Sequence, residues 1–155
     1  MNCLTQDMFF CINPNNEEHL RKLSIFEELN NLEKSISSSL KEISKDKLNN
    51  NIIQQEFCYC DNIGNIIDHC SLKYEKDLKV CYLAFSKIKD KYTERKIVPL
   101  ISHYAKTILK AEEVFSIIDA KDRKLLNHLL SKGYFDLCEE DGFTYLVLDG
   151  YKDKE

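Results

Sequence analysis

The sequence contains no tryptophan, only two prolines and four glycines, and no long uninterrupted apolar run. Because proline and glycine are so scarce among 155 residues, we expect no long disordered tract. No stretch approaches the roughly 18 consecutive apolar residues that a membrane-spanning helix needs, so we predict no membrane partner. The balance of 43% hydrophobic against 31% charged residues is that of a globular chain.

The chain also lacks an excess of positive charge. Its formal net charge is −4, which argues against nucleic acid as a partner, because nucleic-acid-binding domains usually carry a basic surface that displaces counterions from phosphate. Residues 1–7 do not combine a basic region with a following apolar one, as a secretory leader would. We therefore expect a cytoplasmic protein.

Cysteine, in contrast, is well represented. The seven cysteines are Cys3, Cys11, Cys58, Cys60, Cys70, Cys81 and Cys138. Their odd number and scattered positions favour reduced thiols over a disulfide framework. Cys58, Cys60, His69 and Cys70 are the only grouping that suggests a metal site, and an α+β protein with zinc there is a remote alternative. Zinc ligands are usually spaced more widely than Cys58 and Cys60, so we predict no metal and interpret these thiols as small apolar side chains.

The length suits a single domain over residues 1–155, which would bury about 68–70% of the surface of its unfolded chain. A first strand is predicted at 8–12, and Asn15 with Glu18 forms a capping-box pattern that predicts the start of a helix. The apolar stripe of that helix comprises Leu20, Leu23, Phe26, Leu29, Leu32 and Ile36. A Ser-rich bend then precedes a second predicted helix, which begins at a second capping box formed by Ser39 and Glu42.

The middle of the chain reads as strands. Residues 52–61 and 65–74 are rich in aromatic and β-branched residues and flank the turn-like segment Asp61–Gly64, so we predict a hairpin. Residues 78–88 are apolar on both alternating faces, which predicts a strand at the centre of the sheet. A charged loop at 89–96 and a helix at about 98–110 should follow.

The last third contains a buried strand at 114–119, a helix at 121–132 that closes on Lys132-Gly133-Tyr134, and a hairpin ending with residues 143–148. This order resembles the closing segment of the GNAT acyltransferase superfamily, and the predicted elements follow the GNAT order along nearly the whole chain. The resemblance implies an α/β (α+β) fold with a mixed, mostly antiparallel sheet of about six to seven strands flanked by about four helices. It also implies acyl transfer from acetyl-CoA or another acyl-CoA to an amine.

In GNAT proteins, the loop before the third helix binds the coenzyme pyrophosphate through backbone N–H groups and the positive end of the helix dipole. The resemblance places this motif on Thr93, Glu94, Arg95, Lys96, Ile97 and Val98. Its two glycine positions are Lys96 and Val98 here. Either basic side chains replace the lost backbone contacts, or the larger side chains fill the groove. The resemblance further implies that the backbone of Ser86 and Ile88 contacts the pantetheine arm, and that Asp122 takes a coenzyme-binding position usually held by asparagine.

Catalytic groups are harder to assign by this resemblance. The family's general-acid tyrosine falls on Leu129, which cannot donate a proton, and His128 and Tyr134 are nearby donors. Candidate general bases are carboxylates on the hairpin, namely Glu56, Asp68 and Glu75.

Two functions follow from the resemblance. The first is an N-acyltransferase in which the amine of a small molecule or peptide attacks the acyl-CoA directly within a ternary complex. The alternative is a GNAT-like binding or regulatory module that has lost coenzyme chemistry and acts through its surface, for example as a homodimer built on the last hairpin.

Overall fold

A computed structural model of the protein describes residues 8–32, 51–89 and 95–148. Its centre is a seven-stranded sheet in the order β1-β2-β3-β4-β5-β7-β6. The strands are β1 (Phe9–Cys11), β2 (Ile52–Cys60), β3 (Ile66–Glu75), β4 (Val80–Phe85), β5 (Glu113–Asp119), β6 (Tyr134–Glu140) and β7 (Phe143–Leu148). All neighbouring strands are antiparallel except β4 and β5, which are parallel. The prediction of a mixed, mostly antiparallel sheet with β4 at its centre is therefore confirmed.

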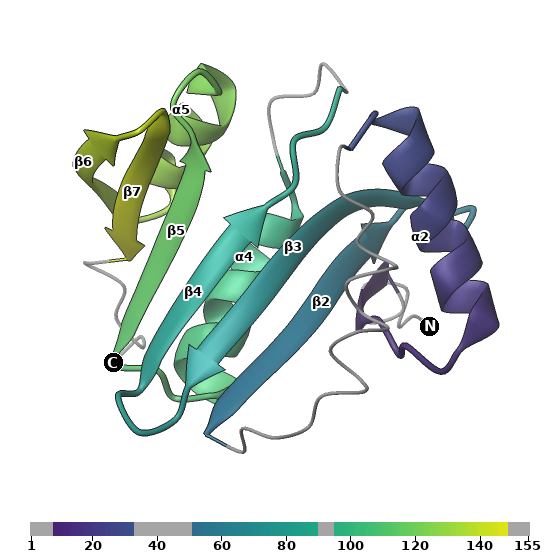
Figure 1. Cartoon of the computed structure of the whole chain (residues 1–155), viewed down its shortest axis with the longest axis horizontal. Coiled ribbons are helices and arrows are strands. Elements are labelled where there is room, and N and C mark those ends of the chain that lie inside the picture. The colour runs from purple at the N-terminus through teal and green to yellow at the C-terminus, as the bar shows by residue number, and fades with distance from the viewer. Residues whose placement is uncertain (1–7, 33–50, 90–94, 149–155) are drawn as a thin grey trace.

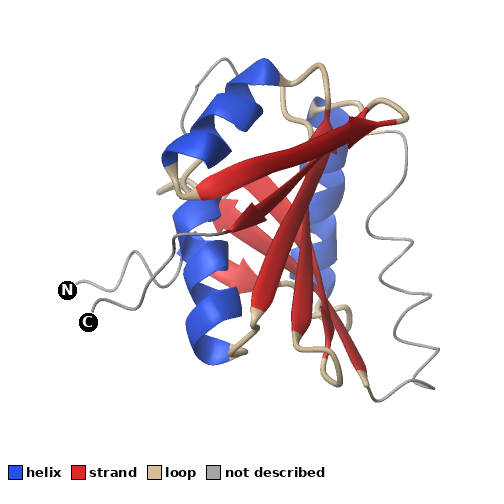
Figure 2. Cartoon of the chain, turned by 90° about the vertical axis from the view of Figure 1, so that its left-hand side faces the viewer, coloured by secondary structure: helices blue, strands red, loops and turns tan. Residues whose placement is uncertain are grey.

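Helices lie on both faces of this twisted sheet (Figures 1 and 2). Helix α2 (Glu17–Leu29) covers β2 and β3 on one face, whereas α4 (Ile97–His103) and α5 (Arg123–Ser131) lie on the other. Helix α4 continues directly into a π-helical turn, η1 (Tyr104–Ile108). The described ranges thus contain three helices rather than about four, and the helix predicted from Ser39 falls outside them. None of these helices is long and apolar enough to cross a bilayer.

Helix α2 begins one residue later than the capping-box pattern predicted. Its N-cap is Asn16, not Asn15, and the Asn16 Oδ1 accepts hydrogen bonds from the amides of Glu18 and His19 at 2.9 and 3.1 Å. Leu23 and Phe26 are buried as predicted, but Leu29 is 69% exposed. The predicted stripe is therefore wrong at Leu29, whereas Leu32 packs against the core beneath the helix and Ile36 lies outside the described residues.

The larger hydrophobic core lies between the sheet and the helices α4 and α5. Its most deeply buried members are Cys70, Leu72, Cys81, Leu83, Ile97, Val98, Ile101, Ala105, Val114, Leu129 and Leu146. A smaller core beneath α2 contains Leu23, Phe26, Cys58, Cys60 and Ile66. The two cores are on opposite faces because successive strand residues point to opposite sides of a sheet.

Strand β4 is buried on only one of its two faces. Cys81 and Leu83 are fully buried beneath the α4 side, whereas on the other face Val80 is buried, Tyr82 is half-buried and Ala84 is exposed. The prediction that both faces of this strand are buried is wrong at Tyr82 and Ala84, because α2 covers β2 and β3 and no described helix covers β4 on that side. Tyr82 instead stacks on Phe115 of β5, with ring centroids 5.8 Å apart.

The β2–β3 hairpin has the predicted turn, in which Asp61 Oδ1 accepts hydrogen bonds from three amides and Gly64 adopts a φ of +102°. Its register pairs Cys58 with His69 and Phe57 with Cys70. Cys70 therefore lies on the opposite face from Cys58 and His69, so these side chains do not converge on one point. Within the described residues, no group of three or more His, Cys, Asp or Glu side chains could hold a metal ion.

Candidate active site

The parallel strands β4 and β5 separate at their C-terminal ends (Figure 1). They pair from Val80 opposite Glu113 to Ala84 opposite Ile117, and the residues that follow leave the ladder. The chain after β4 instead stays with β3, since the Ser86 amide donates to the His69 carbonyl at 3.1 Å. The two strands thus part at their C-terminal ends, where ligands often bind in sheets of this kind.

A buried polar cluster lies beside this separation on the α2 side of the sheet. His69 Nε2 is 2.7 Å from Glu56 Oε1, and His69 Nδ1 is 2.7 Å from Ser86 Oγ. The second oxygen of Glu56 accepts a hydrogen bond from the Ser71 hydroxyl at 2.8 Å. Glu56 and His69 are almost fully buried, whereas Ser86 is half-buried. The cluster thus connects a buried carboxylate to a hydroxyl at the end of β4.

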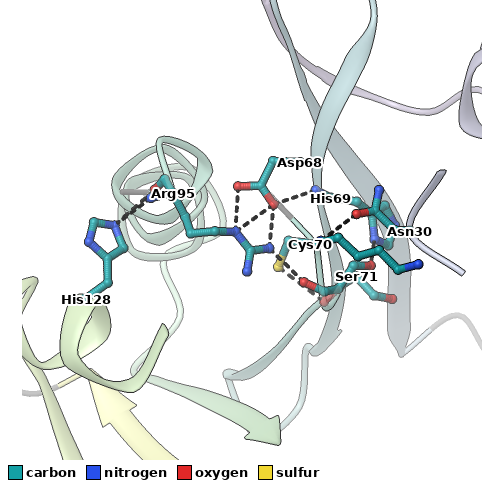
Figure 3. A network of polar contacts seen from close by, with 9 residues as sticks. Asn30, Asp68, His69, Cys70, Ser71, Arg95 and His128 are labelled. Carbon is teal, nitrogen blue, oxygen red and sulfur yellow. Dashed lines mark hydrogen bonds and ion pairs between the residues drawn. The ribbon is translucent and has the colours of Figure 1, made fainter. Parts of the chain in front are cut away.

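An ion pair lies next to this cluster, on the α4 side of the sheet (Figure 3). Arg95 reaches from the start of α4 to Asp68 on β3, where its Nε is 2.9 Å from Asp68 Oδ2 and its Nη2 also bonds the carboxylate. Arg95 Nη2 donates a further bond to the Ser86 carbonyl at 2.9 Å, and Asp68 Oδ1 accepts the His69 amide at 2.8 Å. Both charged side chains are only 5% exposed. Arg95 and Asp68 therefore fix the backbone on either side of the cluster.

The residues of the predicted coenzyme loop have different environments. Thr93 and Glu94 lie outside the described residues. Lys96 is exposed at the N-cap of α4, and no side chain caps that helix end. Ile97 and Val98 are fully buried in the larger core, so only their backbone could face a ligand.

The remaining predicted coenzyme residues surround the strand separation. Ile88 is half-buried and packs against the smaller core. Asp122 is the N-cap of α5, where its Oδ1 accepts the Leu125 amide at 3.1 Å. Across the separation, Lys87 Nζ is 3.6 Å from Asp119 Oδ2. The hydrogen bond from the Lys121 amide, reinforced by Lys87, lowers the pKa of the Asp119 carboxyl.

The helix α5 provides a contact that sequence reasoning had not assigned. Leu129, at the position of the family's acid, is fully buried in the core. The neighbouring His128 points toward the loop before α4, and its Nε2 is 3.1 Å from the Arg95 carbonyl (Figure 3). His128 therefore connects α5 to Arg95, two residues before α4 begins.

The structure brings two of the three candidate bases together. Glu56 and Asp68 both contact His69, through its ring and its amide respectively. Glu75 pairs with Ile52 and Val80 at the opposite end of β3. Seven residues of strand separate it from Asp68, which is roughly 23 Å.

Tyr134 is buried on the α4 side, where its hydroxyl is 2.8 Å from Ser102 Oγ. Burial raises the pKa of this phenol well above its ordinary value. We expect Tyr134→Phe to lower the free energy of unfolding by about 1–3 kcal/mol, because Ser102 would keep a buried hydroxyl without this partner. Urea denaturation would measure the loss, and an unchanged midpoint would mean that this hydrogen bond contributes no stability.

An apolar groove of about 290 Å³ lies on β4, β5, β7 and β6, on the face that no described helix covers. Its lining residues are Tyr82, Phe115, Ile117, Leu137, Cys138, Glu140 and Tyr145. Tyr82 and Ser86 are four residues apart along β4, or roughly 13 Å, so the groove approaches the polar cluster along the same strand. Among the described residues that line the groove, Glu140 is the only acidic one.

Sequence reasoning missed His69, Ser71 and Ser86 as a connected group. Counting outward from the turn, with Asp61 opposite Gly64, would have placed His69 opposite Glu56, whereas Ser71 holds that position in the structure. The register shifts between Tyr59 and Cys60, and such a bulge is not visible in the sequence. The contact of Ser86 with His69 depends on the path of the chain after β4, which no local pattern specified.

Together, the element order, the single parallel pair at the centre of the sheet and the separation of β4 from β5 define the GNAT acyltransferase fold. A chimera of Vibrio cholerae spermidine N-acetyltransferase SpeG and hSSAT superposes with a TM-score of 0.68 at 14% identity, covering 90% of this chain and 94% of its own. Campylobacter jejuni N-acetyltransferase PseH superposes with a TM-score of 0.64 at 15% identity, covering 92% and 97%. A dodecameric structure of the Vibrio cholerae spermidine enzyme gives 0.64 at 12% identity, covering 90% and 91%.

Comparisons of the sequence itself find no relative: no family model matches, and no curated protein does. The likeness to the acetyltransferases is thus a likeness of fold.

Proposed function

We propose that this protein is an N-acyltransferase, in which an amine attacks the carbonyl carbon of an acyl-CoA thioester within a ternary complex. The observation that carries this proposal is the separation of β4 and β5 next to the uncapped N-terminus of α4. Strand backbone beside the separation can hydrogen-bond an extended amide-containing chain such as pantetheine, although both backbone groups of Ser86 are already bonded, its amide to His69 and its carbonyl to Arg95. The helix terminus supplies N–H groups and partial positive charge for a pyrophosphate. Acetyl-CoA or another acyl-CoA is the proposed co-substrate.

The phosphate contacts are proposed to come from Lys87 and Lys96, together with the α4 backbone. Arg95, which the sequence suggested for this role, is engaged in the buried ion pair with Asp68. Lys96 is exposed at the helix N-terminus, and Lys87 is exposed beside the strand separation. On coenzyme binding, Lys87 would leave its ion pair with Asp119 and bind a phosphate oxygen. A charge-assisted hydrogen bond to phosphate is stronger than a solvated surface ion pair.

The decisive measurement is thermal unfolding with and without acetyl-CoA. A ligand at about 100 times its dissociation constant adds about 2.7 kcal/mol, which for a chain of this size raises the unfolding midpoint by about 5–10 °C. Absence of any shift with millimolar acetyl-CoA and longer acyl-CoA would contradict the proposed function.

The double variant Lys87→Ala/Lys96→Ala is expected to weaken acetyl-CoA binding at least about tenfold, because two charged phosphate donors are lost. Isothermal titration calorimetry would measure the dissociation constant. Lys76→Ala/Lys132→Ala removes the same charge from exposed positions away from the strand separation and is the matched control. Equal affinities of the two double variants would show that net charge, and not this phosphate site, governs binding.

The acceptor is proposed to be an amine, on a small molecule or peptide, that reaches the thioester along the apolar groove. The aromatic rings of Tyr82, Phe115 and Tyr145 could hold the apolar or cationic part of such a molecule. The Glu140 carboxylate could pair with a second positive charge on it. Two of the superposing structures are of spermidine N-acetyltransferases. Polyamines are therefore the first acceptors to try.

The chain is further proposed to act as one domain in the cytoplasm, since the described cysteines are all free thiols. A homodimer through strand β6 is proposed because Phe135 and Leu137 are exposed along that edge strand.

The competing role, a module without coenzyme chemistry, has one specific observation in its favour: the position that the resemblance gives to the general acid is the buried Leu129. The acetyl-CoA measurement separates the two roles.

A further inference from the structure

We propose that Ser86, His69 and Glu56 form a proton relay that deprotonates the acceptor amine at the end of β4. This relay would be the general base for the acceptor amine, which the sequence did not identify. The inference rests on the proposed acyltransferase function. Its three members come from three adjacent strand segments, and its outermost group, the Ser86 hydroxyl, lies where β4 leaves β5.

The hydrogen bonds define the direction of proton transfer. An ionised Glu56 can only accept, so it selects the neutral tautomer of His69 that carries its hydrogen on Nε2. Nδ1 is then an acceptor, and the hydroxyl of Ser86 donates to it over 2.7 Å. This is the arrangement of an activated hydroxyl: a base within hydrogen-bond reach, oriented by a third group.

Neighbouring groups hold this geometry. Ser71 bonds the second oxygen of Glu56, so the carboxylate cannot rotate away from His69 without losing two hydrogen bonds. The ring of Phe26 on α2 lies 6.4 Å from the His69 ring, centroid to centroid, and covers the cluster from the helix side. Arg95 binds the Ser86 carbonyl on the opposite side of the sheet and fixes the residue that bears the reactive hydroxyl.

The exposure of the three side chains increases from Glu56 toward Ser86, opposite to the proposed direction of proton transfer. Glu56 and His69 are almost fully buried, whereas Ser86 is half-buried at the strand separation. A purely structural network would have no need of a partly open member beside the strand separation. Ser86 is therefore the point at which a bound amine could transfer its proton.

The chemical step balances without any further reactant. The amine nitrogen attacks the thioester carbon, the N–C bond forms as the C–S bond breaks, and coenzyme A leaves as its thiolate. The proton of the amine passes to Ser86 Oγ while the original hydroxyl proton moves to Nδ1 of His69. Glu56 stabilises the resulting imidazolium through its hydrogen bond with Nε2, and the return of the proton to the thiolate restores the relay.

Reactivity of Ser86 toward a small sulfonyl fluoride tests the relay without knowledge of the acceptor. Methanesulfonyl fluoride should modify Ser86 in the wild-type protein, as located by peptide mass spectrometry. The rate should fall at least about tenfold in His69→Gln, because the hydroxyl loses its base, and modification at this site should disappear in Ser86→Ala. Ser131→Ala, at an exposed serine of α5, is the matched control and should react like wild type. Failure of wild-type Ser86 to react, or an unchanged rate in His69→Gln, would overturn the relay.

Kinetics with acetyl-CoA and a polyamine provide the second readout. His69→Gln and Ser86→Ala should each lower kcat by about 10²–10⁴-fold with little change in the KM for acetyl-CoA. The double variant should lose no more than either single one, because the two groups act as a unit. A retained kcat, or a loss confined to KM, would contradict the relay.

The thermal shift with acetyl-CoA, measured on the same variants, separates the two proposals. Serine modification that depends on His69, without any coenzyme-induced stabilisation, would contradict the acyltransferase and leave an activated serine. Coenzyme-induced stabilisation with an unreactive Ser86 would support the acyltransferase and overturn the relay.

Discussion

Replacement of Arg95 by methionine is expected to lower the free energy of unfolding by about 3–5 kcal/mol, because it leaves the Asp68 carboxylate buried without its counter-charge. Arg95 and Asp68 are each 5% exposed, so water cannot take the place of the lost guanidinium. The same substitution removes the hydrogen bond to the Ser86 carbonyl and the contact with the Phe85 ring, 5.9 Å from the guanidinium carbon.

Urea denaturation of three variants tests this expectation. Arg123→Met removes an exposed arginine and should change stability by no more than about 0.5 kcal/mol. The double variant Asp68→Asn/Arg95→Met should recover part of the loss, because the buried charge is gone and the asparagine oxygen can still accept the His69 amide. A single Arg95→Met variant as stable as Arg123→Met would show that the ion pair is not buried in solution.

Raising the pH from 8 to 10 is expected to lower the free energy of unfolding by about 4 kcal/mol through three buried thiols alone. Burial raises the pKa of Cys81 to about 12, and raises the pKa values of Cys58 and Cys70 well above their ordinary 9.0. A thiol whose pKa is raised by folding contributes its full stability below the unfolded value. That stability is lost as the pH rises above 9, because only the unfolded chain then ionises, at about 1.4 kcal/mol per thiol by pH 10.

The slope of the free energy of unfolding against pH, compared between variants, separates the effect of these thiols from that of other groups that titrate at alkaline pH. The triple variant Cys58→Ala/Cys70→Ala/Cys81→Ala should show a shallower decline between pH 8 and 10, although its stability at neutral pH is lower. Cys138→Ala removes an exposed thiol and should keep the wild-type slope. Parallel curves for the triple variant and wild type would show that these thiols ionise as readily in the folded protein as in the unfolded chain.

Much of the fold could be predicted because its signals are local. The aromatic and β-branched residues of 52–61 and 65–74, with turn chemistry between them, predicted the β2–β3 hairpin, and the aspartate and glycine of that turn behave as expected. The errors also have local causes. Asn15 and Asn16 are adjacent and equally suited to capping, and the choice between them depends on where the chain leaves β1.

The candidate site could be predicted only in part. The resemblance gave Glu56 and Asp68 of the β2–β3 hairpin as candidate general bases, but it gave no reason to connect either with His69 or Ser86. Arg95 illustrates the limit, since a basic residue before a helix reads as a phosphate ligand in the sequence and is a buried ion-pair partner in the structure.

The sequence by itself determined the order of the described elements, because apolar periodicity and turn residues act over a few neighbouring positions. Tertiary structure alone decided that the chain after β4 follows β3 rather than β5. That path places Ser86 beside His69 and brings Arg95 to Asp68, residues that are 17 and 27 positions apart. Contacts over such distances depend on how the whole sheet is paired and covered, so no short stretch of sequence can encode them.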